Sequence, residues 1–529
     1  MTSPDNATSS NRGLRRGLKA RHLAMISIGG VIGVGMFLGS GATVRLGGPG
    51  VVFSYLLGGV IMMLVMVALG EMSVAYPVAG SFRTYAAEFL HPYFGFTVGW
   101  IYWLSWLVVM SAEIVAATTY MSFWFPRGMT WIFGLLFALA MTVVNVRSVE
   151  SFGEFEFWFS LIKVMAILAF IAVGAMAILG IVIKPALGLS NYTGYGGFFP
   201  NGLRGVFLAM VMVMVAYGGT EVIGVAAAET RDPEKNVPKA INGIVARTLI
   251  LYVGSMTILV GTIPWMRVGL GGSPFVKVFT LLGIPAAPHI MNLVVISAAL
   301  SSMNSGLYTS SRMLYSLAEV GFAPRALAVT NPKTKVPARC VLISTASLYL
   351  GVLAYHLSPA GAFLYITGIA AFGFLFSWLV ISLSHIYFRR SFVKTHGVKA
   401  LKYKMPGYPY TSWFALGAMV VIIATLWFIP QQRAGLLSGL VLLAGVSAYW
   451  LFLTREHTLA GGRVPAPLAW LERAGRPGPV LGQNMLLRRE GSRETLETPG
   501  DLPPVAFSAL GLASFYGLED ELEDRSTGF

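Results

Sequence analysis

The sequence is short of charged residues and of cysteine, and both shortages narrow what the chain can be. Charged residues make up 12% of its 529 positions, whereas soluble proteins carry roughly 25%. So few charges hardly suffice for a water-facing surface on a chain of this length. The single cysteine, Cys340, can form no disulfide within the chain, so the sequence does not indicate an oxidising compartment.

Signatures of catalysis and of cofactor binding are also absent from the sequence. The Gly-x-Gly patterns follow no strand and precede no Gly-Lys-Ser/Thr, so they are not nucleotide-binding loops. There is no metal-ligand spacing, and no nucleophile is arranged with a base. We therefore expect neither an enzyme nor a bound cofactor or metal.

Long apolar runs, in contrast, fill most of the chain. Hydrophobic residues make up 55% of it, and the mean hydropathy is +0.69. The runs reach about 20 residues, enough to span a bilayer. We expect an all-α integral membrane fold of about twelve spans, at residues 23–44, 50–75, 95–122, 129–149, 156–182, 202–227, 242–264, 286–317, 338–356, 361–387, 411–430 and 434–453. The first 21 residues are polar and basic, so a cleaved signal peptide is not expected.

The positive charges are unevenly divided between the loops. One set of alternate loops holds 21 Lys and Arg residues and the other set holds 7. Because Lys and Arg concentrate in cytoplasmic loops, this bias predicts a multi-pass protein of the plasma (inner) membrane with both termini in the cytoplasm. It also explains the net charge of +15 without nucleic acid, which we do not expect as a partner.

Three parts of the chain follow from these spans. Residues 1–21 form a cytoplasmic N-terminal segment, residues 22–455 the transmembrane domain, and residues 456–529 a C-terminal tail. The tail is rich in Pro, Gly and charge, beginning basic and ending acidic. Such composition is typical of a solvated, mobile segment, although a regulatory role is an alternative. The sequence leaves the number of subunits open.

Two spans contain glycines where a continuous helix would disfavour them. The first holds Ile28-Gly29-Gly30-Val31-Ile32-Gly33-Val34-Gly35, and the sixth holds Ala216-Tyr217-Gly218-Gly219-Thr220-Glu221. Each interior glycine costs roughly 0.5–1 kcal/mol relative to alanine. Close helix packing is one explanation. Breaks in two corresponding spans are, however, the best sequence pointer to a transporter with a site at the membrane midplane.

An unwound helix can hold both ends of a zwitterion. The N–H groups that begin the second half-helix attract a carboxylate, and the carbonyls that end the first half-helix attract a cation. For the first span we predict that the Val31 carbonyl receives the ammonium group of an amino acid. The carboxylate would then bind the N–H groups of Gly33, Val34 and Gly35.

These motifs resemble the amino acid–polyamine–organocation superfamily, in particular its bacterial amino acid permease branch. The resemblance covers about residues 14 to 455 and rests on three stretches, 28–41, 216–240 and 301–308. It implies a LeuT-like five-plus-five inverted repeat with discontinuous first and sixth helices, two extra C-terminal helices, alternating access, and uptake driven by protons. It implies substrate contacts at Gly33, Val34, Gly35, Ala216, Tyr217, Gly218 and Gly219, with Tyr217 shielding the substrate from one side.

Three ionisable residues stand out within predicted spans, where charges are expensive and tend to be functional. For Lys163 the alternatives are snorkelling to the surface and binding the coupled proton. By resemblance, a lysine here occupies the place of sodium in sodium-coupled relatives, and we favour coupling, with Ser301 and Ser302 as polar neighbours. Glu221 either accepts N–H groups of the unwound first helix or carries a proton. Glu113 does not by itself indicate a cationic substrate.

Other acidic residues receive a simpler interpretation. Glu150, Glu154 and Glu156 fall at the predicted boundary between the fourth and fifth spans, where we expect water to solvate them. The predicted function is that of a secondary active amino acid permease. The alternatives are an exchanger or facilitator of the same fold and a transporter-like nutrient sensor. Small residues at 34, 218 and 219 favour a neutral or broad range of substrates.

Overall fold

The computed structural model describes residues 14, 16–182, 184–268, 273–281, 283, 286–357 and 362–459. The chain divides into two units, Met1–Gly462 and Arg463–Phe529, and everything below concerns the first. The N-terminal segment up to residue 13 and the predicted C-terminal tail from residue 460 onward lie outside the described residues.

The described residues fold almost entirely into helices, as expected, with a single bridge between Leu18 and Thr230 in place of any strand. In chain order the helices are α1 (Ala20–Gly29), η2 (Gly35–Gly39), α2 (Ser40–Gly47), η3 (Gly48–Gly50), α3 (Val51–Ala75), α4 (Phe82–Phe89), α5 (Pro92–Met121), α6 (Arg127–Arg147), α7 (Val149–Ile178), α8 (Ser190–Thr193), α9 (Gly202–Ala216), α10 (Val222–Ala226), η4 (Ala227–Glu229), α11 (Pro233–Thr262), η5 (Trp265–Arg267), α12 (Pro274–Leu281), α13 (Ala287–Glu319), η6 (Arg325–Leu327), α14 (Ala338–Leu357), α15 (Ala362–His396), η7 (Val398–Ala400), α16 (Tyr410–Thr425), η8 (Leu426–Phe428) and α17 (Pro430–Leu459).

Each of the twelve predicted spans corresponds to a helix or to a broken pair of helices. Ten stretches within the described residues are long and apolar enough to cross a membrane. The sixth span is divided between α9 and α10, and the first begins with the short α1 before its break. The last two spans form a tight hairpin, since η8 ends at Phe428 and α17 begins at Pro430. The all-α membrane fold with two discontinuous helices is therefore confirmed.

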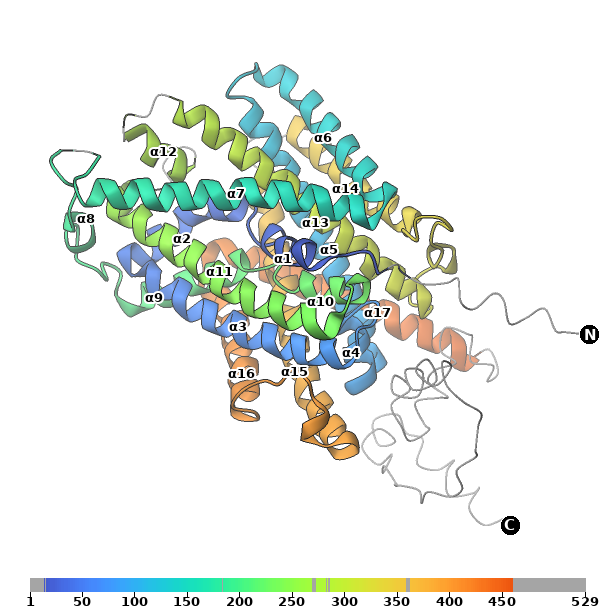
Figure 1. Cartoon of the computed structure of the whole chain (residues 1–529). Helices are drawn as coiled ribbons and strands as arrows, with labels where there is room; N and C mark the ends of the chain where they lie inside the picture. Colours follow the sequence, from blue (N-terminus) through green and yellow to red (C-terminus); the bar gives the residue numbers. More distant parts are fainter. Residues whose placement is uncertain are drawn as a thin grey trace, which may run out of the picture. The chain divides into compact units, whose positions relative to one another are not determined.

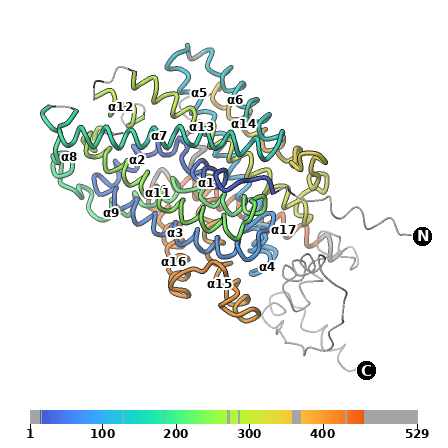
Figure 2. The backbone as a smooth tube through the Cα atoms, viewed as in Figure 1, coloured from blue at the N-terminus to red at the C-terminus, as the bar shows by residue number. Residues whose placement is uncertain are grey.

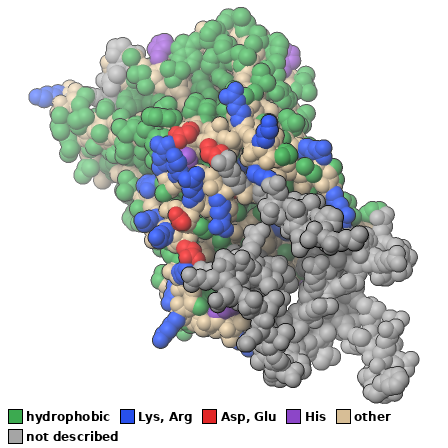
Figure 3. Space-filling model, turned by 45° about the vertical axis from the view of Figure 1, so that its right-hand side comes forward, with side chains coloured by type: hydrophobic (Ala, Val, Ile, Leu, Met, Phe, Trp, Pro, Cys, Tyr) green, Lys and Arg blue, Asp and Glu red, His purple; other side chains and the backbone are tan. Residues whose placement is uncertain are grey.

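The broken helices lie inside the bundle rather than at its margin. Figures 1 and 2 show α1 between α7 and α11, and it also contacts α10 and α13. Within the most apolar 18-residue stretch of α13, 83% is buried inside the bundle, whereas only 17% of the corresponding stretch of α17 is buried. Hydrophobic side chains form a broad continuous cover on the face in Figure 3, with Lys and Arg gathered beside it. The least buried helices thus present the apolar surface that lipid requires.

A buried ionic cluster ties the segment between α15 and α16 to the bundle. The Arg389 guanidinium donates to Glu71 Oε2 (2.9 Å) and lies 4.5 Å from the centre of the Tyr408 ring. The backbone N–H of Met405 donates to the same carboxylate oxygen (2.6 Å), and His385 Nε2 lies 3.2 Å from it. Glu71 and His385 are fully buried. The cluster therefore joins α3, α15 and the segment that precedes α16.

Removing one partner of this cluster should destabilise the protein. In Arg389→Ala, Glu71 would stay buried without its charged partner, a situation that costs about 3–5 kcal/mol. The purified protein should then melt several degrees lower in a thermal-stability assay. Arg390→Ala is the matched control because the adjacent arginine is exposed. Equal melting temperatures for the two variants would contradict the assigned role.

Candidate functional site

The first break separates α1 from η2 and leaves residues 30–33 outside any helix. Glycine is required here by close approach. A Cβ at Gly29 would lie 1.7 Å from Glu156 Oε1, and a Cβ at Gly33 would lie 2.2 Å from Glu113 Oε1. The missing side chains thus make room for two carboxylates from neighbouring helices, in addition to allowing the helix to unwind.

The second break faces the first directly. The residues between α9 and α10 include Gly219, whose φ of +100° is rarely adopted by other residues. A Cβ at this position would lie only 2.3 Å from the Gly30 carbonyl oxygen. The unwound backbones of the two broken helices are therefore in contact.

Glu221 supports the second break. Its fully buried carboxylate accepts hydrogen bonds from the Gly219 backbone N–H (3.0 Å), the Tyr102 hydroxyl (2.7 Å) and the Trp378 indole (2.9 Å). The expectation that Glu221 accepts N–H groups from the first broken helix is wrong, because its donors come from its own broken stretch, α5 and α15. Glu221 thus fixes the second break against two continuous helices.

Lys163 supports the first break. Its side chain on α7 is fully buried, which excludes snorkelling. The ammonium donates to the carbonyl oxygens of Gly29 (2.7 Å) and Ile32 (2.8 Å) and to Ser301 Oγ (2.9 Å). Each N–H of the ammonium therefore has an acceptor. The predicted neighbour Ser301 is confirmed as a contact, and the positive charge sits where the first half-helix ends.

Glu113 occupies part of the predicted carboxylate site. The backbone N–H of Val34 donates to both of its carboxylate oxygens (3.3 and 3.2 Å). The second predicted serine, Ser302, faces the same point, since its Oγ would lie 3.0 Å from a Cβ at Gly33. Gly35 is exposed, and a Cβ there would meet nothing within 4 Å. Of the three predicted N–H positions, Gly35 has the most open surroundings.

Tyr252 joins the two breaks and was missed by the sequence reasoning. Its hydroxyl lies 3.0 Å from the carbonyl oxygens of both Val31 and Ala216. Val31, the predicted ammonium acceptor, thus already has a partner within the chain. No motif was identified in the seventh span, and a tyrosine in an apolar span carries no distinctive sequence signal.

The remaining predicted contacts surround the second break. Tyr217 is fully buried, and its hydroxyl donates to the Tyr55 carbonyl oxygen (2.8 Å). Its ring lies 5.1 Å from that of Tyr252, edge to face. A Cβ at Gly218 would lie 3.0 Å from the Phe374 ring. Aromatic rings therefore pack against the second break, Tyr252 at Tyr217 and Phe374 at Gly218.

The interpretation of Glu156 as a solvated boundary residue is wrong. The helix α7 begins at Val149, so Glu156 lies two turns inside it and is fully buried. It accepts hydrogen bonds from Asn304 Nδ2 (2.8 Å), Ser160 Oγ (3.0 Å) and Ser301 Oγ. The spacing of seven residues from Lys163 was the available signal, because it places both side chains on one face of a helix.

The interpretation holds for the neighbouring carboxylates. Glu154 has a side chain 42% exposed and pairs with Arg21 and His22 at the surface. Glu150 is half-buried in the first turn of α7. Two of the three acidic residues at this boundary are thus partly solvated, and only Glu156 belongs to the site.

A comparison with known families decides the class of protein. The sequence model of the family described as "Amino acid permease" matches residues 22–455. The chain belongs to the amino acid permease family. The matched region includes both breaks and every residue predicted for the site. It confirms the resemblance drawn from the motifs, and it points to a transporter of amino acids rather than to an enzyme.

Relatives of this permease in Bacillus subtilis (strain 168) match it over most of its length. An "Uncharacterized amino acid permease YtnA" is 45% identical over 437 residues, 82% of this chain and 94% of the relative. A "Gamma-aminobutyric acid permease" is 42% identical, and the match covers 84% of this chain and 95% of the relative. "Amino-acid permease RocE" is 43% identical, and the match covers 83% of this chain and 94% of the relative.

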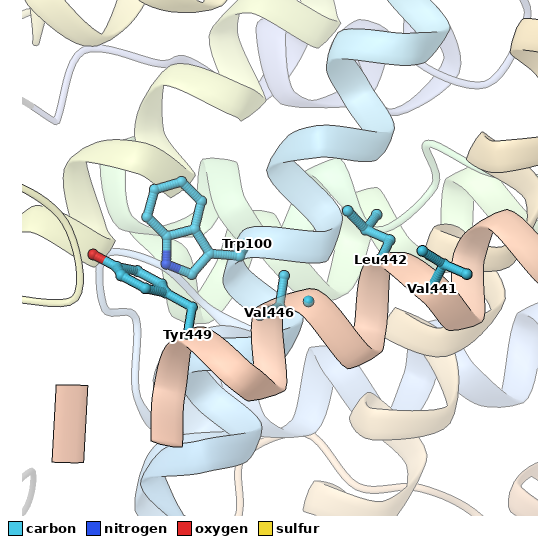
Figure 4. A pocket seen from close by; sticks show the side chains of 6 residues that line it. Trp100, Val441, Leu442, Val446 and Tyr449 are labelled. Atoms are coloured by element: carbon cyan, nitrogen blue, oxygen red, sulfur yellow. The ribbon is translucent and has the colours of Figure 1, made fainter. Parts of the chain in front are cut away.

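An apolar cavity of about 370 Å³ lies elsewhere on this permease (Figure 4). It is formed by Trp100 of α5 and by residues of α17, among them Val441, Leu442, Val446 and Tyr449. Neither broken helix contributes to it, and its lining offers little to bind a zwitterion. We therefore place the candidate site at the breaks and not in this cavity.

Adding a methyl group at Gly219 should damage the site. In Gly219→Ala, a left-handed backbone costs about 1–2 kcal/mol, and the new Cβ must push the Gly30 carbonyl away. Because this contact is part of the site, uptake should fall by about tenfold or more at normal levels of protein in the membrane. Gly417→Ala in α16 is the control, since its Cβ meets nothing within 4 Å. Unchanged uptake by Gly219→Ala would remove the contact of the two breaks from the mechanism.

Proposed function

We propose that this permease imports L-amino acids across the plasma membrane by alternating access, in symport with protons. The observation that carries the proposal is the buried ammonium of Lys163, bound to the Gly29 and Ile32 carbonyl oxygens at the first break. A cation at this place holds the half-helix end in position. Because an amine can release its proton, the same contact can be made and broken by protonation, which couples a proton gradient to movement of α1.

The broken helices support an amino acid as the substrate. The N–H groups at the start of η2 and the carbonyls at the end of α1 attract a carboxylate and an ammonium group, respectively. The Glu113 carboxylate already makes an interaction of the first kind, since it accepts a hydrogen bond from the Val34 N–H. We infer that the carboxylate of the substrate binds at the neighbouring, exposed Gly35 or replaces Glu113.

The second break does not provide the space that its glycines suggested for a substrate side chain. Gly218 packs against the Phe374 ring and Gly219 against the Gly30 carbonyl, so the range of substrates is inferred from similar proteins. Similar proteins differ in their names, which include a "Gamma-aminobutyric acid permease" and a "Putative histidine permease". We therefore propose a neutral or broad range of L-amino acids, with both termini of the permease in the cytoplasm as the Lys and Arg distribution indicates.

Uptake into proteoliposomes tests the proposal as a whole. The purified permease should accumulate at least one of the common L-amino acids when the interior is made alkaline, and a protonophore should abolish the accumulation. Exchange that ignores the pH gradient would indicate an exchanger. Failure of every amino acid to be transported or to compete would overturn the proposed substrate class.

Lys163→Gln tests the coupling group. The amide still donates to the two carbonyls but cannot carry a proton, so accumulation against a gradient should disappear while counterflow exchange continues. Ile162→Ala is the control, because its neighbouring side chain is exposed on the same helix. Accumulation by Lys163→Gln equal to that of the unaltered permease would show that the proton travels elsewhere.

A further inference from the structure

Glu156 is a buried carboxylate that the family motifs and the proposed substrate contacts do not use. It lies where α7 packs against α13 and α1. Its oxygens accept hydrogen bonds from Asn304 and Ser160, and Asn304 Oδ1 in turn accepts one from Asn145 Nδ2 of α6 (2.8 Å). This ring of neutral donors can hold an ionised carboxylate away from water.

One hydroxyl connects this carboxylate to Lys163. The Lys163 ammonium donates to Ser301 Oγ (2.9 Å), and the Ser301 hydroxyl donates to Glu156 Oε1. An ammonium, a hydroxyl and a carboxylate therefore form an unbroken chain of two hydrogen bonds between α7 and α13. Such a chain is the arrangement needed to pass a proton without water.

We propose that Glu156 is a second proton-carrying group of the transport cycle and exchanges its proton with Lys163 through Ser301. This inference rests on the proposed proton coupling. In the forward step an N–H bond of the ammonium breaks and its proton binds Ser301 Oγ, while the Ser301 O–H proton binds Glu156 Oε1. A positive and a negative group become a neutral amine and a neutral acid, with the hydroxyl restored and no other reactant required.

The transfer has a mechanical consequence at the first break. While Lys163 is charged, its hydrogen bonds to the Gly29 and Ile32 carbonyls are charge-assisted and roughly twice as strong as neutral ones. A neutral amine holds the end of α1 less tightly. The proton transfer would therefore loosen α1. The backbone of Gly29 also packs directly against Glu156, since a Cβ at Gly29 would lie 1.7 Å from Glu156 Oε1.

The position of Glu156 gives the transfer a direction. The backbone of Glu156 lies seven residues before that of Lys163, about 10 Å nearer the N-terminal end of α7. The Ser301 bridge brings their polar atoms within two hydrogen bonds of each other. The N-terminal end of α7 is the end where Arg21 and Glu154 meet at the surface. In the proposed orientation the proton thus moves toward the cytoplasm as the site opens there.

The charged groups around Glu156 are few in the part of the chain that the structure describes. Lys163, on the same helix, attracts Glu156 electrostatically, and Lys163 is also attracted by Glu113 of α5. The groups that α13 and α6 present are the neutral Ser301, Asn304 and Asn145. His22 of α1 contacts Glu154 rather than Glu156. The attraction between Lys163 and Glu156 is therefore the main charge interaction at Glu156, and it favours the ionised pair until a movement of α1 weakens the contacts of the ammonium.

The test separates accumulation from exchange in proteoliposomes. Glu156→Gln should lower accumulation driven by the pH gradient by about tenfold or more, and counterflow should stay within about twofold of the unaltered permease. A pH-sensitive dye trapped inside should show the matching loss of proton entry. Glu154→Gln is the control, because its exposed carboxylate lies two residues away on the same helix.

Two further variants distinguish proton transfer from structural support. Ser301→Ala keeps both titratable groups but removes the bridge, and it should slow proton entry in the same way. Glu156→Asp keeps a carboxyl group and should restore part of the accumulation that Glu156→Gln loses. Parallel loss of counterflow and accumulation in Glu156→Gln, or full accumulation by it, would overturn the inference. Absence of proton-driven accumulation in the unaltered permease would instead overturn the proposed function itself.

Discussion

The bond between the Lys163 ammonium and the end of α1 is the constraint on which the rest of the site depends. A helix that stops inside the membrane leaves carbonyl groups without intrahelical partners, and no water is available there to satisfy them. Lys163 supplies the donors for Gly29 and Ile32. Because the lysine is itself buried, it in turn requires the acceptors, so the break and the charge stabilise each other.

The glycines of the two breaks make room for neighbouring groups as well as allowing the backbone to unwind. Three carboxylates, those of Glu113, Glu156 and Glu221, lie against glycine backbone at or beside the breaks, where no side chain excludes them. Where the breaks meet, Gly30 and Gly219 approach more closely than any Cβ would allow. The Tyr252 hydroxyl then holds the two unwound segments together. Polar groups that would be costly alone in an apolar bundle thus satisfy one another.

Much of this site was visible in the sequence because local pattern and chemistry agree there. Glycine clusters inside apolar runs indicated both breaks, and an isolated lysine in a span indicated a functional charge. Glu156 was misjudged because its helix was expected to begin seven residues too late, which placed it in water. Tyr252 was missed because one hydroxyl in an apolar span looks like ordinary packing until its neighbours are known.

The sequence by itself determined that this chain spans a membrane many times, where its helices break, and which permease family it belongs to. These properties depend on hydrophobicity, backbone freedom and motifs, all of which are local. Only the tertiary structure decided which groups meet: that Val34 faces Glu113, that Glu221 is held by α5 and α15, and that Ser301 bridges Lys163 and Glu156. Such contacts depend on how distant helices pack, and the spacing of residues along one helix does not specify its neighbour.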